Sequence, residues 1–345
     1  MAPGMKVGAG QLPRPHVAAR MTRALDDGCL LVVAPAGYGK TLAIQQAVEQ
    51  RLEQRGGVAA WLSCRDRDAD GGRLVVSILE AVRRTVPGAA DVLLDQLGEA
   101  GEAVDPSTAA QALVDDLERL LVEPLVLVLD DVERLADAPA AMAVLGALLE
   151  GAGGPLRLVV ASRRRPPLKL AKLTATGLVT ELGEADLVFT SEECAAVLEA
   201  RIGRSPTDAE IEETMARTLG WPLGVALGAE RIDAVDPDAS IASIEQFLVE
   251  EVLDALDAPT RRTLLDSSVV DELCPGILQA LDVTPEALES AARLGLSMRP
   301  VAGTPRATAW HPLVREALLR RWRREVDDAD RALLLDRAGA ALAAE

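Results

Sequence analysis

The sequence predicts an α/β fold in which a parallel sheet is flanked by helices and followed by smaller, mainly helical domains. Three observations lead to this prediction. Short, nearly continuous apolar runs recur through the first half of the 345-residue chain, as is typical of strands buried on both faces. Longer helical patterns separate these runs, and such alternation predicts a parallel sheet covered on both sides. After about residue 188 the strand signals fade while helical signals continue.

Five strands and four intervening helices are expected in the first half. The strands are expected at Cys29–Ala34, Val58–Leu62, Leu125–Leu129, Leu156–Ala161 and Leu178–Leu182. The helices are expected at Lys40–Arg55, Arg73–Val86, Ser107–Val122 and Pro139–Leu149. In the third of these helices one apolar stripe is formed by leucines at helical spacing, namely Leu113, Leu117, Leu120 and Leu121.

The second half is expected to contain helices and one hairpin. The stretch "TSEECAAVL" begins a helix that Thr190 or Ser191 can cap, with Glu192 or Glu193 in its first turn. The Asp-rich segment Asp233–Asp238 is interpreted as a linker. The segment Ser297–Thr308 is expected to form a small hairpin or wing. The last helices are expected near Ile241–Ala255, Pro259–Ser267, Pro285–Leu294, Pro312–Arg324 and Ala329–Leu342.

Composition limits the class of protein and its partners. Hydrophobic residues make up 49% of the chain and aromatic residues only 2%, so the cores must be filled by Leu, Val and Ala. The formal net charge is −18, with 54 acidic and 36 basic side chains. Nucleic-acid binding depends on Lys and Arg displacing counterions, so we expect no direct nucleic-acid binding by this chain. The arginines of residues 315–324 fit a solvated helix face better than a phosphate-binding one.

Cysteine usage and hydropathy indicate a cytoplasmic protein. The four cysteines, Cys29, Cys64, Cys194 and Cys274, are far apart, and with two histidines in the chain no zinc-ligand spacing occurs. Isolated cysteines in apolar surroundings are usually core residues of a reduced protein. The N-terminus has no apolar segment of the signal-peptide kind, and no apolar run has the roughly 18 residues that a membrane helix needs.

The stretch "LLVVAPAGYGKT" has the form of a phosphate-binding loop, G-x-x-x-x-G-K-[ST], with Ala34 in place of the first glycine. An apolar strand leads into it, and a helix begins where it ends, so backbone N–H groups and the helix N-terminus can bind phosphate. Lys40 is expected to bind the β- and γ-phosphates, and Thr41 to give its hydroxyl to Mg²⁺. The nucleotide-binding candidates of this loop are Ala36, Gly37, Tyr38, Gly39, Lys40, Thr41 and Leu42.

The stretch "PLVLVLDDVERL" provides acidic groups for the same edge of the sheet, because parallel strands share their carboxyl ends. Asp130 is expected to hold Mg²⁺ together with Thr41. Asp131 is expected to orient or deprotonate the attacking water. Asp131 and Lys40 are the two catalytic candidates. The alternative for the Asp pair is capping of a following helix.

The stretch "LRLVVASRRRPP" ends a further strand at Ser162 and Arg163, again at the nucleotide edge. An arginine there can bind a γ-phosphate and so report its presence. Arg163 is favoured over Arg164 and Arg165. The alternative is that the three arginines solvate a loop.

Eight motifs in this order resemble the MalT-type ATP-dependent regulators, large LuxR-family transcription activators of the STAND class of signal-transduction ATPases. They are "APAGYGKT", "WLSCRDRDAD", "LVLVLDDVERL", "VVASRRRPPLKLAKL", "LVTELGEADLVFTSEECAAVL", "GWPLGVAL", "FLVEEVLDALDAPTRRTLLDSSVVDELC" and "HPLVREALLR". The resemblance runs from about Leu12 to about residue 342. It implies a P-loop NTPase domain at 1–188, a small helical domain at 189–240 and a winged-helix domain at 241–345.

The same resemblance implies an ADP-bound, closed resting state that opens on exchange for ATP and then self-associates. Pro222 of "GWPLG" matches a proline near the adenine, and His311 of "HPLV" matches a histidine that reaches the ADP phosphate in the closed form. Arg14 lies in a segment that borders the nucleotide. The alternative for His311 is a residue placed just before a helix whose first position is Pro312. The family's sensor repeats and C-terminal helix-turn-helix are absent from this sequence, so the inducer or regulatory partner is unknown.

Two classes of function follow from these residues. The first is an ATP/ADP switch with Mg²⁺ and slow hydrolysis. The second is an enzyme proper, either a motor ATPase or a small-molecule phosphotransferase, but neither a trans-acting arginine nor an acceptor pocket can be singled out. GTP is disfavoured because no N-K-x-D motif follows the loop. An inactive scaffold is disfavoured by the intact Lys40, Thr41, Asp130 and Asp131.

Overall fold

The computed structural model describes residues 12–89, 91, 93, 95, 105–229, 232, 245–246, 253–293, 296, 298–301 and 306–343. Its contacts divide the chain into two compact units. The first comprises residues 1–34 and 39–187, and the second comprises Pro35–Tyr38 with residues 188–345. None of the helices that the structure describes is long and apolar enough to cross a membrane.

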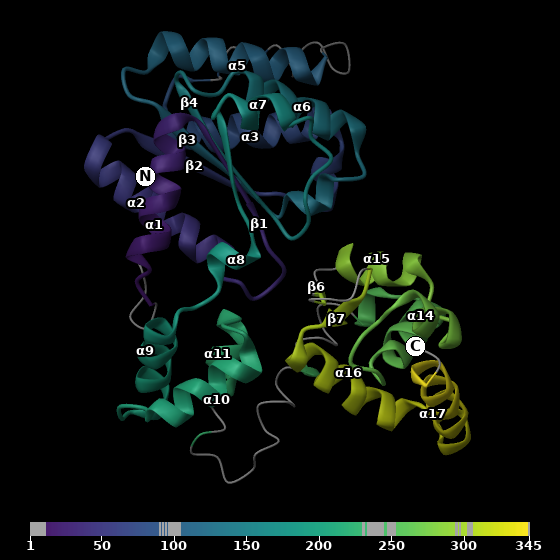
Figure 1. Cartoon of the computed structure of the whole chain (residues 1–345). Coiled ribbons are helices and arrows are strands. Elements are labelled where there is room, and N and C mark those ends of the chain that lie inside the picture. Colours follow the sequence, from purple (N-terminus) through teal and green to yellow (C-terminus); the bar gives the residue numbers. More distant parts are fainter. Residues whose placement is uncertain are drawn as a thin grey trace. The chain divides into compact units, whose positions relative to one another are not determined.

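A five-stranded parallel sheet forms the centre of the first unit, in the order β2-β3-β4-β1-β5 (Figure 1). The predicted parallel sheet is therefore confirmed, and each strand end lies within one residue of its expected place. Strand β4 lies between β1 and β3, an order that the sequence does not reveal. The strands are β1 (Cys29–Val33), β2 (Val58–Ser63), β3 (Leu125–Asp130), β4 (Leu156–Ser162) and β5 (Val179–Leu182).

Helices cover both faces of the sheet, with α1 and α2 on one face and α3, α5 and α6 on the other (Figure 1). Successive side chains along each strand therefore point to opposite faces of the sheet. The side chains of Leu127 and Leu158 belong to the core beneath α3, α5 and α6. The helices of this unit are α1 (Pro15–Asp27), α2 (Lys40–Arg55), α3 (Gly71–Thr85), α5 (Pro106–Leu120), α6 (Pro139–Glu150), α7 (Ala171–Ala175) and α8 (Glu184–Leu187). Two 3-10 turns are η1 (Asp66–Ala69) and η3 (Val132–Leu135).

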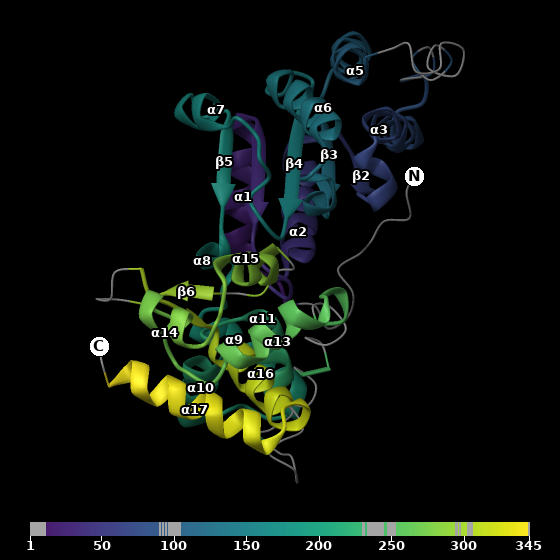
Figure 2. The same ribbon diagram turned by 90° about the vertical axis from the view of Figure 1, so that its right-hand side faces the viewer.

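Helix α1 was not expected from the sequence, although Pro15 at its first position and Gly28 after its end are ordinary boundary residues. Its buried side chains include Val17, Met21 and Leu25, which recur every four residues. The stripe is hard to recognise because small and polar residues fill the rest of the helix. Figure 2 shows α1 and α2 with the strands from a second direction.

The second unit is mainly helical, as expected, and contains one hairpin. Thr190 and Glu193 form the expected capping box at the start of α9. Strands β6 (Met298–Pro300) and β7 (Thr308–Trp310) pair antiparallel, so the hairpin is confirmed, with its second strand extending past Thr308. The helices are α9 (Ser191–Ile202), α10 (Asp208–Thr218), α11 (Pro222–Gly228), α13 (Ala258–Ser267), α14 (Pro275–Ala280), α15 (Pro285–Arg293), α16 (Pro312–Glu325) and α17 (Asp328–Leu342).

Two expectations for this unit fall largely on undescribed residues. The linker Asp233–Asp238 lies outside the described residues, as does most of the helix expected at Ile241–Ala255. The end of that range, Leu253–Ala255, is the 3-10 turn η5. Helix α14 was not expected, since its six residues are too short to show a periodic apolar face.

Candidate functional site

The phosphate-loop motif ends at the N-terminus of α2, where the geometry suits an anion. Gly39 is the N-cap residue, with φ of 72° in the left-handed region, which glycine adopts at little cost. It has no side chain to accept hydrogen bonds from the first N–H groups of α2. The N-terminus of α2, with the positive end of the helix dipole, is the kind of site where a phosphate binds.

Lys40 and Thr41 begin α2 and point to groups of the first unit. The Lys40 ammonium donates to the Ala34 carbonyl at 2.8 Å, which spans the loop. Burial lowers the pKa of Lys40, and the negative charge of Glu133 opposes that shift. The Thr41 hydroxyl donates to Asp130 Oδ2 at 2.8 Å. The expected neighbourhood of Lys40, Thr41 and Asp130 is therefore present in the fold.

Asp130 is the last residue of β3 and Asp131 follows it, just before η3, and the environments of the two differ. Asp130 is 4% exposed and its Oδ1 accepts the Asp131 N–H at 3.0 Å. Asp131 has φ of 58°, a left-handed conformation that costs energy for a residue with a Cβ. Burial raises the pKa of Asp131, and the nearby carboxylates of Asp130 and Glu133 raise it further. A more basic carboxylate suits the predicted role of Asp131 in orienting or deprotonating water.

The residues present fit a magnesium ion with phosphate and water as its other ligands. The hydroxyl of Thr41 and the buried carboxylate of Asp130 are hard oxygen donors, and they already lie in contact. Magnesium takes few protein ligands of this kind and keeps several waters or phosphate oxygens. In the part of the chain that the structure describes, no three His, Cys, Asp or Glu side chains converge as ligands of one metal.

Arg163 follows β4 and forms an ion pair with a residue that sequence reasoning missed. Its Nε lies 3.1 Å from Glu133 Oε1, and its backbone N–H donates to Glu133 Oε2 at 3.0 Å. Glu133 lies in turn η3, three residues after Asp130. The signal in the sequence was the further acid in "DDVERL", but only the fold brings it to Arg163.

Arg14 precedes the first residue of α1 and is almost fully buried, at 4% exposure. Its guanidinium donates to the Leu187 carbonyl at 2.8 Å, and its backbone N–H donates to the Gln46 side chain at 3.0 Å. Arg14 thus joins α1 to α2 and α8 within the first unit. Leu42, in the first turn of α2, is half-buried.

The middle of the loop, Pro35–Tyr38, packs with the second unit. The Trp221 indole donates to the Ala36 carbonyl at 3.2 Å, and the Leu223 N–H donates to the Gly37 carbonyl at 3.0 Å. Tyr38 is buried, with its ring centroid 6.5 Å from that of Trp221. A Cβ on Gly37 would lie 2.7 Å from Leu223 Cβ, so only glycine permits this packing.

Pro222 and His311 both belong to the second unit. Pro222 is buried at the first position of α11. His311 is the N-cap of α16, where its Nδ1 accepts the Leu313 N–H at 3.3 Å. Its Nε2 lies 2.8 Å from the Thr218 carbonyl, which accepts the hydrogen bond when Nε2 carries the proton. His311 thus lies just before the helix that begins at Pro312, which was the alternative for this residue, and its role toward ADP stays a prediction.

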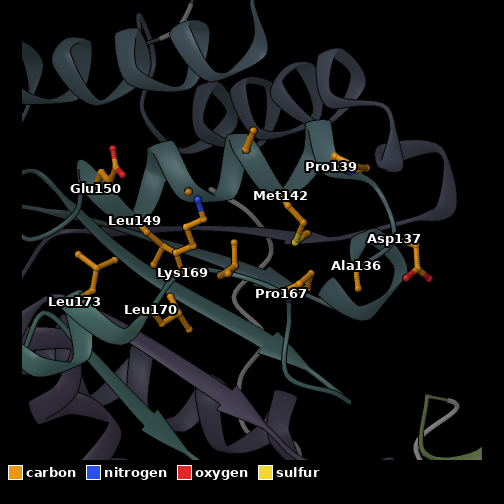
Figure 3. A pocket seen from close by; sticks show the side chains of 13 residues that line it. Ala136, Asp137, Pro139, Met142, Leu149, Glu150, Pro167, Lys169, Leu170 and Leu173 are labelled. Atoms are coloured by element: carbon orange, nitrogen blue, oxygen red, sulfur yellow. The ribbon is translucent and has the colours of Figure 1, made fainter. Parts of the chain in front are cut away.

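A groove in the first unit lies between α6 and the segment 167–173 (Figure 3). Its volume is about 640 Å³, and Met142, Leu149 and Leu170 contribute apolar surface. None of the residues assigned to nucleotide binding lines this groove. Its chemistry is therefore separate from that of the loop.

Two protein-family models match this chain. The model of the AAA ATPase domain matches residues 16–161, which contain the loop, Asp130 and Asp131. The model of the MalT winged helix domain matches residues 249–330. Together they confirm a P-loop ATPase domain followed by a winged-helix domain of the MalT type.

Curated relatives include two kinds of protein. The serine/threonine-protein kinase PknK of Mycobacterium tuberculosis (strain ATCC 25618 / H37Rv) is 30% identical over 307 residues, which are 86% of this chain and 27% of that protein. The HTH-type transcriptional regulator MalT of Vibrio parahaemolyticus is 29% identical over 325 residues, 88% of this chain and 34% of that protein. This chain thus spans about a third or less of the length of these relatives.

Among solved structures, the Walker-type ATPase PABY2304 of Pyrococcus abyssi aligns with 91% of this chain and 97% of its own, at a TM-score of 0.60. The two sequences are 13% identical. This similarity shows that the fold is that of a P-loop ATPase.

Proposed function

We propose that this chain, which has the ATPase and winged-helix domains of the MalT-type STAND ATPases, is an ATP/ADP-dependent molecular switch in signal transduction. The observation that carries the proposal is the contact between Thr41 and Asp130 beside the open N-terminus of α2. That arrangement offers backbone N–H groups, one ammonium, one hydroxyl and one carboxylate to a magnesium nucleotide.

Each residue of this region has a proposed part. The N–H groups of residues 36–42 and the ammonium of Lys40 would bind the phosphates. Thr41 and Asp130 would hold Mg²⁺, which when bound neutralises phosphate charge. Asp131 would orient the attacking water, and its raised pKa favours accepting the proton. Arg163 would contact the γ-phosphate and so distinguish ATP from ADP.

The second unit would set the state of the switch. We propose that the resting protein is closed and holds ADP, with Pro222 near the base, His311 near the phosphate and Arg14 at the border of the nucleotide. Exchange for ATP would then open the chain and allow self-association. The division into domains at 1–188, 189–240 and 241–345 belongs to the same proposal.

Regulation of transcription is the proposed context, since one set of relatives is named HTH-type transcriptional regulator. The acidic balance of 54 against 36 charged side chains argues that DNA contact would be made by a segment other than these residues. A cytoplasmic location fits four buried cysteines that form no disulfide.

The nucleotide content of the purified protein tests this function. The protein is denatured with acid, and the released nucleotide is identified and counted by chromatography. We expect about one ADP per chain, since a switch with slow hydrolysis retains its product. An empty site combined with rapid ATP turnover would overturn the proposal and favour a motor ATPase.

A further inference from the structure

Glu133 makes several contacts with the two residues at the end of β4. Its Oε2 accepts the Arg163 N–H at 3.0 Å and lies 3.4 Å from the Ser162 hydroxyl. Its Oε1 lies 3.1 Å from Arg163 Nε. The side chains of Glu133 and Arg163 are 12% and 24% exposed, so the pair is shielded from salt and water more than a surface ion pair is.

The Arg163 guanidinium is the positive charge that a γ-phosphate would bind, and in this structure it is paired with Glu133. A guanidinium bound to a carboxylate offers less to a phosphate, because both anions compete for the same N–H donors. The charge of Glu133 also acts on Lys40, where it is the largest influence opposing the effect of burial on the pKa. Glu133 therefore pairs with Arg163 and acts electrostatically on Lys40, the two cations assigned to the terminal phosphates.

We propose that Glu133 sets the preference of this site between nucleoside diphosphate and triphosphate by holding Arg163 away from the γ-phosphate. With ADP bound, Arg163 stays paired with Glu133 and its charge is compensated. With ATP bound, Arg163 exchanges the carboxylate for the γ-phosphate. Glu133 thereby lowers the affinity for ATP relative to ADP, which stabilises the resting state. This inference rests on the proposed nucleotide switch, and Glu133 acts in it as a positioning residue.

The neighbouring ion pair provides a matched control. Arg164 lies 3.1 Å from Asp137, as close as Arg163 lies to Glu133. Asp137, however, is 87% exposed, so solvent screens this pair more than it screens the pair of Glu133 and Arg163. If an ion pair at this edge served only to brace the loops, the removal of either acid would have the same consequence.

The experiment compares Glu133→Gln, Arg163→Gln, the double variant and Asp137→Asn. The affinities for ATP and ADP, each with Mg²⁺, are measured for every protein by calorimetry. The glutamine keeps an oxygen for the Arg163 N–H but removes the charge. We expect Glu133→Gln to raise the ratio of ATP to ADP affinity about tenfold, and Asp137→Asn to leave it unchanged. Because the ratio is taken within one sample, a partly unfolded variant gives the same answer.

The double variant separates positioning from a simple field effect. Arg163→Gln should weaken the binding of ATP more than the binding of ADP. Adding Glu133→Gln should then leave the ratio of ATP to ADP affinity within about twofold of that of Arg163→Gln, since no Arg163 remains to be released. A tenfold rise that persists without Arg163 would overturn the proposal, and so would an unchanged ratio in Glu133→Gln. A wild-type protein that binds neither nucleotide would instead overturn the switch itself.

Discussion

The phosphate edge of the first unit and the Trp221–His311 region of the second unit use different chemistry. At the phosphate edge, the pKa of Lys40 is influenced by the charges of four other side chains, namely Asp130, Asp131, Glu133 and Arg163. In the second region two rings make polar contacts with backbone carbonyls. Trp221 donates to Ala36 and His311 to Thr218, and the two rings meet edge-on at 5.3 Å.

This difference indicates what each region can respond to. A charged side chain can exchange one ionic partner for another, so the phosphate edge can register a ligand without leaving a buried charge uncompensated. A ring that is hydrogen-bonded to a carbonyl has no equivalent anionic partner to exchange. The second region therefore fixes geometry within its own unit, and the proposed contact of His311 with ADP would require its Nε2 to leave the Thr218 carbonyl.

Among the variants that test this difference between the two regions, Lys40→Ala is expected to have the largest effect. The variant removes the only side-chain ammonium of the phosphate loop, and a hydrogen bond to a charged group is worth about 2–3 kcal/mol. We expect nucleotide affinity to fall roughly 100-fold. Calorimetric titration with ADP and ATP measures it directly.

Lys172→Ala is the matched control, because Lys172 lies exposed on α7. It carries the same charge but belongs to neither region. Equal affinity losses in the two variants would mean that net charge, and not the loop, determines binding.

A smaller effect is expected from His311→Ala in the second region. The variant loses the bond to the Thr218 carbonyl and the cap of α16. The two together should lower the free energy of unfolding by about 2 kcal/mol. Urea unfolding followed by circular dichroism measures this loss. If His311 is also the proposed ADP latch, ADP should dissociate faster from the variant.

His311→Asn separates the two roles. Asparagine is a good N-cap residue, but its shorter side chain does not extend as far as the imidazole. It should recover about half of the lost stability. ADP dissociation that matches the wild type in both variants would leave His311 as a structural residue alone.

The sheet could be predicted from the sequence because buried parallel strands need apolar residues at nearly every position. Residues such as Val126 and Val128 in β3 face one side, and Leu127 and Leu129 face the other. Helix α1 was missed because its stripe is interrupted by polar and small residues. The placement of β4 between β1 and β3 depends on how the crossovers pack, which no local pattern records.

The candidate site was predictable only where one motif contains it. Gly39, Lys40 and Thr41 are neighbours in the sequence, whereas Glu133 and Arg163 are 30 residues apart. The bond from His311 to Thr218 spans 93 residues. Such contacts depend on tertiary packing. A strand-end motif indicated Arg163 and the family resemblance indicated His311, but neither revealed the partners that these residues have in the fold.

The smallest expected effect concerns one buried cysteine in the core of each unit. The two cysteines should give the two units the same dependence of stability on pH. Burial raises the pKa of Cys29 in the first unit and of Cys194 in the second, each from 9.0 to about 11. A thiol whose folded pKa is raised contributes stability that is present below the unfolded pKa and is lost as pH rises toward the folded pKa. Each thiol should therefore lower the free energy of unfolding by about 1 kcal/mol between pH 9 and pH 10.

Urea unfolding of Cys29→Ala and Cys194→Ala at both pH values measures the change in unfolding free energy over this interval. The cost of the vacated volume is the same at both pH values and cancels. Both variants should lose about 1 kcal/mol less than the wild type over this interval. A reduced slope in only one of them would show that the cores of the two units differ as their functional residues do.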